Sequence, residues 1–201
     1  MENNNMTKII LATTSPYRKE VFRYLGIPFE VEGSKIDESK SERDNPEELV
    51  KNLSKLKAEA VAKNHQDAIV IGMDSVGFFG GKIFEKPKSR EEDFQRLKAL
   101  SGNNHQFYTG VYIMDTTSGK TLSEVVKTDV SMREISEEEI NQYLDEDVNF
   151  NTYALGYDPV KHISASFVKK IKGSYYNLLG GMPLETIIEM LKEIGHKEGK
   201  I

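Results

Sequence analysis

The sequence predicts an α/β fold with a mixed, twisted sheet and flanking helices. In the first half of the chain, short apolar runs alternate with amphipathic helical segments, a pattern typical of parallel strands joined by helices. Residues 68–73 are apolar at nearly every position and predict a central strand that is buried on both faces. Two longer strand-like stretches follow at 105–114 and 120–133. The short turn between them, at 115–119, indicates antiparallel pairing.

The first elements are bounded by clear signals. Residues 8–12 predict a strand, 16–25 a helix and 28–32 a second strand. Residues 33–45 carry seven charges and one aliphatic residue, Ile36, and predict an exposed loop. Asn45 followed by Pro46 is a strong helix start, and the helix is expected to continue to about Asn64.

The later elements follow in the same way. Gly80-Gly81 predicts a hairpin between residues 76–79 and 83–84. Capping signals at Ser89 and Ser136 predict helices that end near residues 100 and 144. Residues 145–162 are irregular, 166–171 predict a strand, and 183–194 predict the last helix. The polar tail at 195–201 is expected to be loose, and no linker divides the chain, so residues 1–201 predict one domain.

Composition excludes several classes of protein. The formal net charge of −5 argues against broad nucleic-acid binding, and any anion site must be a local cluster of cations. There are no cysteines, so disulfides, thiolate catalysis and Cys-based zinc sites are excluded. No apolar run has the length of a membrane span, and the first residues lack a signal-peptide core. We therefore expect a cytoplasmic protein that binds neither membrane nor nucleic acid.

The first strand-to-helix turn is a candidate anion site. Ser15 is a predicted N-cap and Pro16 the first helical residue, while Arg18 and Lys19 lie in the first turn. Cations at the positive end of a helix dipole are unfavourable without an anion, and the free backbone N–H groups there bind phosphate well. Basic side chains that point into solvent explain the same pattern equally well.

Four further positions are candidates for chemistry. Asp74 follows the buried strand, where ligands bind in open α/β sheets, although an Asp at a strand end also caps turns. Lys57 is predicted at the edge of the apolar face of its helix, where a lysine can also extend into solvent. Glu38 lies in a charged loop and is expected to be solvated, unless it is a ligand of a cation that also binds a phosphate. Pro87 restricts the backbone of Lys86 to an extended conformation, which would aim this lysine, although the end of a surface hairpin would look the same.

Taken together, these segments resemble the Maf family of nucleotide pyrophosphatases, relatives of the inosine triphosphatases. Each segment alone is weak, but the set has the order and spacing of the family over about residues 8–192. The matching segments are residues 11–20 (LATTSPYRKE), 36–38 (IDE), 55–58 (KLKA), 71–76 (IGMDSV), 85–87 (EKP), 100–102 (LSG), 108–110 (YTG), 173–175 (GSY) and 181–184 (GMPL).

The resemblance implies a strongly twisted sheet with a cleft, as in inosine triphosphatase. It also implies hydrolysis of a nucleoside triphosphate to the monophosphate and pyrophosphate. On the matching positions, Asp74 is the implied proton acceptor, and Ser15, Arg18, Lys57 and Lys86 the implied triphosphate ligands. A divalent metal ion, magnesium or manganese, is implied at Glu38 and Asp74, with Glu85 as a further candidate ligand.

The sequence departs from the family at three places that bear on the base, one of which is residues 158–161, where the usual Gln or Glu of both branches is missing. Tyr17 stands where an arginine accompanies dTTP and UTP in one branch, and an aromatic residue resembles the branch that takes 7-methyl-GTP. Ser75, however, stands at a position where that branch has Gln and the dTTP/UTP branch has Thr, so it matches neither. We expect a modified purine nucleotide, with dTTP/UTP or a catalytically weak, nucleotide-binding regulator of septum formation as alternatives. The antiparallel stretches at 105–133 also offer an edge through which a homodimer would form.

Overall fold

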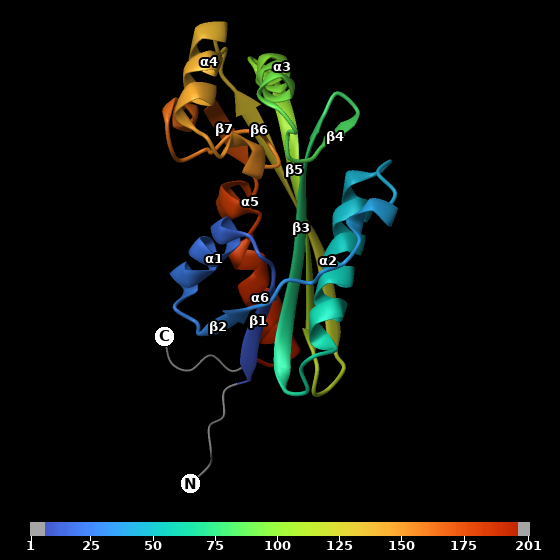
Figure 1. The fold of residues 1–201 in the computed structure, drawn as a ribbon. Helices are drawn as coiled ribbons and strands as arrows, with labels where there is room; N and C mark the ends of the chain where they lie inside the picture. The colour runs from blue at the N-terminus through green and yellow to red at the C-terminus, as the bar shows by residue number, and fades with distance from the viewer. Residues whose placement is uncertain (1–6, 197–201) are drawn as a thin grey trace.

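The computed structural model describes residues 7–196, and within them it has a seven-stranded mixed sheet (Figure 1). The strand order is β2-β1-β3-β5-β6-β7, and β4 pairs with β3 off this path. β1 pairs in parallel with both β2 and β3. The pairs β3–β5, β5–β6 and β6–β7 are antiparallel. The strands are β1 (Lys8–Ala12), β2 (Phe29–Val31), β3 (Ala68–Phe79), β4 (Lys82–Phe84), β5 (Asn104–Asp115), β6 (Thr121–Met132) and β7 (Val168–Lys172).

The helices lie on both faces of this sheet, with α2 on one face and α1, α5 and α6 on the other (Figure 1). Short 3-10 turns connect several of them, at Arg23–Leu25, Glu38–Lys40, Phe150–Thr152 and Ile163–Ser166. The α-helices are α1 (Pro16–Phe22), α2 (Pro46–Ala62), α3 (Arg90–Leu100), α4 (Glu137–Glu146), α5 (Tyr175–Gly180) and α6 (Leu184–Ile194).

The alternation of side chains along the central strands builds two cores. Ile9, Leu11 and Met73 face α1 and α6, whereas Ile10 and Val70 face α2, as the two-residue period of a strand requires. Both sets are buried, which explains why these strands are apolar at nearly every position. A further cluster, at the far end of the sheet, joins α3, α4 and the adjoining ends of β5 and β6.

The backbone of α2 lies very close to the sheet because two glycines face it. A Cβ at Gly72 of β3 would overlap the carbonyl oxygen of Ser54, and one at Gly110 of β5 would overlap that of Val50. Gly110 pairs directly with Asp74 across the two strands. The absence of side chains there therefore sets the height of α2 above the part of β3 that carries Asp74.

The edge of β3 has a gap in its pairing. β5 pairs with one edge of β3 along Ile69–Phe78. On the other edge of β3, pairing with β1 ends at Gly72 and pairing with β4 starts only at Gly77. Residues 73–76 therefore have no strand on that side, and the sheet has a notch beside Asp74 and Ser75.

The expected fold class is confirmed, and most element boundaries agree within a few residues. Three details differ from expectation. β3 does not end at Met73 but continues through Asp74 to Phe79, so Asp74 lies within a strand. Residues 175–180 form the short helix α5, which had not been expected, and Ser166 belongs to a 3-10 turn instead of to β7.

Other expectations fall partly outside what the structure describes. The predicted loose tail lies largely in residues 197–201, outside the described residues, as do the first six residues in which a signal peptide was sought. Within residues 7–196, no helix is both long and apolar enough to cross a membrane. Dimerisation and the single domain stay predictions.

Candidate functional site

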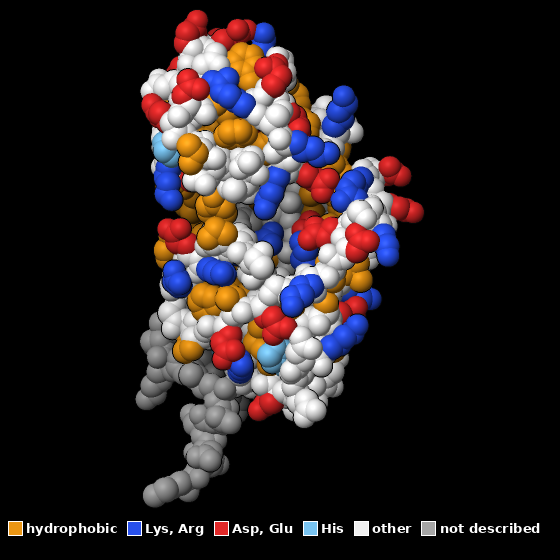
Figure 2. Space-filling view, viewed as in Figure 1, with side chains coloured by type: hydrophobic (Ala, Val, Ile, Leu, Met, Phe, Trp, Pro, Cys, Tyr) orange, Lys and Arg blue, Asp and Glu red, His pale blue; other side chains and the backbone are white. Residues whose placement is uncertain are grey.

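A cavity of about 1340 Å³ opens at the notch in the sheet. Figure 2 shows a hollow in this face with Lys and Arg side chains in it and Asp and Glu side chains along one edge. All nine candidate residues line the cavity, so segments far apart in the sequence converge as expected. They are Ser15, Tyr17, Arg18, Glu38, Lys57, Asp74, Ser75, Glu85 and Lys86.

The start of α1 has the predicted capping geometry. Ser15 is the N-cap, its side chain accepts a hydrogen bond from the backbone N–H of Arg18, and Pro16 is the first helical residue. The first turn contains no acidic residue. The positive end of the helix therefore faces the cavity without a carboxylate of its own helix to neutralise it.

Arg18 crosses from α1 to the unpaired edge of β3. Its Nη1 donates to the Met73 carbonyl oxygen at 3.0 Å and its Nη2 to Ser75 Oγ at 2.9 Å. All of its hydrogen-bond acceptors are neutral, and it makes no ion pair with a carboxylate of residues 7–196. Burial lowers the pKa of this guanidinium, while Asp74 and Glu38 raise it from a greater distance. A partly buried cation without a direct counter-ion is suited to binding an anionic ligand.

One lysine joins the two central carboxylates of the site. Lys57 Nζ lies 2.6 Å from Asp74 Oδ1 and 3.0 Å from Glu38 Oε1. The side chains of Lys57 and Asp74 are only 12% and 11% exposed. Burial raises the pKa of Asp74 above its usual value, although Lys57 and Arg18 both oppose that rise. Asp74 is thus a stronger base than a solvated aspartate.

Glu85 and Lys86 follow β4 and line the same cavity. Both oxygens of Glu85 accept hydrogen bonds from Arg43, at 3.0 Å from Nε and 3.3 Å from Nη2. Lys86 is exposed and has no hydrogen bond or ion pair with any residue that the structure describes. Its ammonium group is free to meet a ligand.

Tyr17 joins α1 to the segment that follows α4. Thr152 Oγ1 donates to the Asn149 carbonyl oxygen at 2.7 Å, so the Tyr17 hydroxyl, also 2.7 Å away, is the donor to Thr152. The Tyr17 and Tyr153 rings are tilted and their centroids are 5.0 Å apart. The two rings contact each other, so a base would stack on an outer ring face and not between them.

Ser75 has its hydroxyl engaged within the protein. Its Oγ accepts the hydrogen bond from Arg18 and lies 2.8 Å from Thr109 Oγ1 on β5. Ser75 therefore orients Arg18, and the fully buried Thr109 supports it from behind.

The residues around Asp74 fit part of a metal site. Glu38 and Asp74 both contact Lys57, which brings two carboxylates to one point, and magnesium typically binds through one or two carboxylates together with substrate phosphate oxygens. Glu85 is held by Arg43 instead. No cluster of three or more His, Cys, Asp or Glu side chains suited to a metal ion occurs within residues 7–196.

Three residues of the site were not found from the sequence: Arg43, Thr109 and Tyr153. Arg43 was one of seven charges in an exposed loop, and its partner Glu85 is 42 residues away, so no local pattern connects them. Thr109 was part of the motif at residues 108–110, and Tyr153 lay in the irregular segment at 145–162, but neither residue was singled out by a signal of its own.

The fold and the cavity define an α/β protein with a charged, ligand-sized cleft at a gap in its sheet. A family model described as "Maf-like protein" matches residues 8–194. The chain therefore belongs to the Maf-like family.

Relatives named for an activity match nearly the full chain. A dTTP/UTP pyrophosphatase of Syntrophus aciditrophicus is 38% identical, over 94% of this chain and 90% of that protein. A 7-methyl-GTP pyrophosphatase of Nitrosococcus oceani is 34% identical, over 94% of each. A HAM1 protein of Coxiella burnetii has the same fold, with a TM-score of 0.50 and 17% identity over 94% of this chain and all of that one.

Proposed function

We propose that this protein hydrolyses the bond between the α- and β-phosphates of a nucleoside triphosphate, releasing pyrophosphate. The observation that carries the proposal is the Lys57–Asp74 pair, which lines the same cavity as Arg18, a cation whose hydrogen-bond partners are neutral. Relatives over the same length of chain are named nucleotide pyrophosphatases, which supports the same reaction class.

The cations of the cavity would hold and neutralise the triphosphate. Phosphoryl-type transfer depends mainly on positioning and on stabilising charge, with little covalent chemistry by the protein. The Ser15 hydroxyl, the backbone N–H of Tyr17 and the Arg18 guanidinium would bind phosphate oxygens. Lys57 and Lys86 would stabilise the charge that builds on the leaving pyrophosphate.

Asp74 would act as the general base that takes the proton of the attacking water. Its raised pKa improves its basicity, and its burial excludes competing solvent. Lys57 holds one of its oxygens in place and leaves the other for the water.

A divalent cation, magnesium or manganese, would be held by Glu38 and Asp74 together with phosphate oxygens. When bound, such an ion would polarise the α-phosphate and acidify a water molecule. Glu85 would join only after release from Arg43, so we assign the ion to the first two carboxylates.

The base preference divides into two candidates. The half-buried Tyr17 and Tyr153 rings in the cavity lining favour a methylated, positively charged guanine, which stacks on aromatic rings by cation–π attraction. The relatives named dTTP/UTP pyrophosphatase favour a pyrimidine. The Ser75 hydroxyl favours neither, because its hydrogen bonds are made within the protein.

The test is a nucleotide panel with and without magnesium or manganese. Purified protein is incubated with 7-methyl-GTP, dTTP, UTP and inosine triphosphate, and pyrophosphate and monophosphate are measured. Metal-dependent release of both products in equal amounts would support the proposal. Tight nucleotide binding without product from any substrate would select the regulatory alternative and reject the enzyme.

A further inference from the structure

We propose that Arg43 is a positioning residue for the triphosphate: its ion pair with Glu85, here called the clasp, ties the loop that carries Glu38 to the end of β4, fixes Glu38 and leaves Lys86 free for a phosphate. The inference rests on the proposed function, since it concerns how the same cavity holds a nucleotide.

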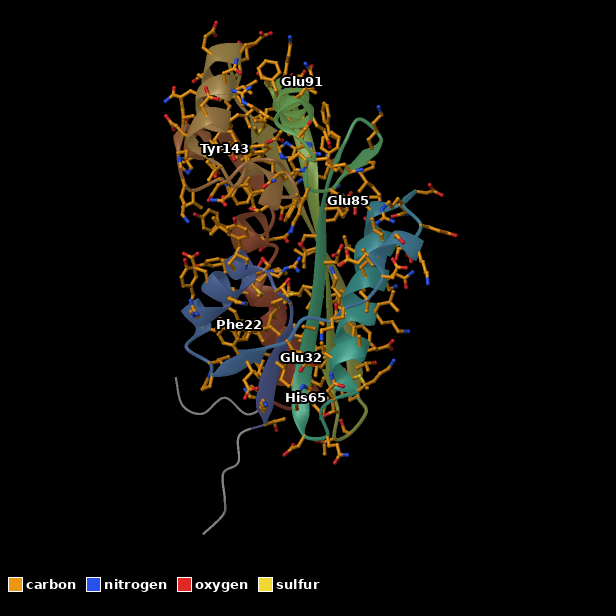
Figure 3. All side chains as sticks on the ribbon, in the orientation of Figure 1. Phe22, Glu32, His65, Glu85, Glu91 and Tyr143 are labelled. Carbon is orange, nitrogen blue, oxygen red and sulfur yellow. The ribbon has the colours of Figure 1, made fainter. Side chains whose placement is uncertain are left out.

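The clasp is more than a single surface contact. Besides its two bonds to Glu85, Arg43 donates from Nη1 to the Ser41 carbonyl oxygen at 2.7 Å and from Nη2 to that of Glu38 at 3.2 Å. One guanidinium therefore holds its own loop in shape and ties that loop to the end of β4. Figure 3 shows Glu85 at the end of β4, beside the loop that leads into α2.

The loop that carries Glu38 has few other anchors. Of residues 33–43, only Ile36 packs against a hydrophobic cluster, the one formed by Leu49, Val50, Leu53, Val76 and Tyr108. The remaining side chains are polar and mostly exposed. Because Arg43 binds the Glu38 carbonyl oxygen, it fixes the backbone from which the Glu38 carboxylate reaches Lys57.

The clasp also decides which cations are available. Lys57 is already shared by Glu38 and Asp74. Without Arg43, the Glu85 carboxylate would be an unpaired anion in the cavity wall beside Lys86, which has no hydrogen bond or ion pair among the described residues. That carboxylate would repel a triphosphate and compete for the Lys86 ammonium group.

The polar contacts form one continuous series from Glu85 to Asp74. Glu85 binds Arg43, Arg43 binds the Glu38 backbone, the Glu38 carboxylate binds Lys57, and Lys57 binds Asp74. Arg43 touches none of the reacting atoms in this scheme. Its effect on catalysis should therefore fall on substrate affinity and not on the chemical step.

The experiment compares Arg43→Ala with Arg90→Ala, measuring KM, kcat and the thermal unfolding midpoint. Arg90 is a matched control, because it is also an exposed arginine paired with a carboxylate, Asp145 at 2.6 Å, but its partner Asp145 does not line the cavity, whereas Glu85, the partner of Arg43, does. We expect Arg43→Ala to raise KM about fivefold or more, a factor within the range of bidentate arginine pairs, with kcat little changed. Arg90→Ala should leave KM unchanged, and neither variant should lower the midpoint greatly.

The double variant Arg43→Ala/Glu85→Gln separates the clasp from other roles of Glu85. If Glu85 repels phosphate once Arg43 is gone, the double variant has a lower KM than Arg43→Ala alone. If Glu85 is instead a metal ligand, the double variant has a higher KM and needs more magnesium. That second result, or an unchanged KM in Arg43→Ala, would overturn the proposal.

Failure of the proposed function would be recognised separately. If the wild-type protein released no pyrophosphate, the same variants would be compared by the Kd for 7-methyl-GTP and dTTP in titration calorimetry. A weaker Kd in Arg43→Ala alone would then support the clasp in a binding protein. Equal Kd values, or no binding by the wild type, would overturn it.

Discussion

Lys57 lies 2.6 Å from Asp74, yet the pKa of Asp74 is still raised by burial. A lysine at this distance normally lowers the pKa of a carboxyl group. Here desolvation outweighs the attraction of Lys57 and Arg18, so the carboxylate is both held in place and more basic than usual. A solvated aspartate is a weak base near neutral pH, and this environment reduces that disadvantage.

The pH dependence of activity should respond to Lys57. Because Lys57 lowers the pKa of Asp74, replacing it in Lys57→Met should raise that pKa further. The base must be deprotonated to act, so the acidic limb of the kcat/KM profile should move to higher pH. A profile with an unchanged acidic limb would show that Asp74 is not the group that titrates.

Asp74→Asn should reduce kcat by about a hundredfold or more, the usual contribution of a general base. The amide keeps the size of the side chain but cannot accept the proton of water. The fold should persist, because Lys57 keeps Glu38 as a partner and a buried charge is removed. Steady-state kinetics and thermal unfolding of the same sample check both points, and near-normal turnover would refute the assignment.

Gly110→Ala tests the close approach of α2 to the sheet. The added methyl group would overlap the Val50 carbonyl oxygen, so α2 must move outward and carry Lys57 away from Asp74. We expect a loss of about 1–3 kcal/mol in the free energy of unfolding, typical of overpacking, together with a lower kcat. Denaturant unfolding and kinetics provide the measurement. A stable variant with full activity would contradict this view of how Lys57 is placed.

Asp93, which lies outside the cavity, should make the stability of the fold depend on pH. This carboxyl group is fully buried, neither of its oxygens has a hydrogen-bond partner, and burial raises its pKa from 3.8 to about 8. Between those pH values the unfolded chain loses this proton before the folded one does, so stability falls as pH rises. Asp93→Asn should therefore melt increasingly higher than the wild type from pH 5 to pH 8. The exposed Asp145→Asn is the control, and a constant difference between Asp93→Asn and wild type would contradict the prediction.

The role of the Tyr17 ring can be measured by substrate discrimination. If its face stacks on a methylated guanine, Tyr17→Leu should lower kcat/KM for 7-methyl-GTP by about threefold to thirtyfold, the range of cation–π contacts. The value for dTTP should change less. An equal loss for both nucleotides would indicate that Tyr17 acts only through its contacts with Thr152 and Tyr153.

Capping residues and apolar runs predicted most of the fold, because they act locally. Ser15-Pro16 and Asn45-Pro46 begin their helices where expected. The continuation of β3 was missed because Asp74 and Ser75 are polar, and their partners Lys57, Arg18 and Thr109 lie far away in the sequence. The short helix α5 was missed because six residues give little helical periodicity.

The sequence grouped residues that the structure brings to one cavity, but it did not indicate their connections. The family resemblance collected the residues that line the cavity, and their chain order alone could not show that Ser75 orients Arg18 or that Arg43 holds Glu85. Such pairs depend on which loops meet across the cleft, which is decided by the packing of the whole chain.

Hydrolysis in water enriched in oxygen-18 tests the central claim most directly. If Asp74 directs water to the α-phosphorus, mass spectrometry should find the label in the nucleoside monophosphate and none in the pyrophosphate. Label in the pyrophosphate, or release of single phosphates, would contradict the account.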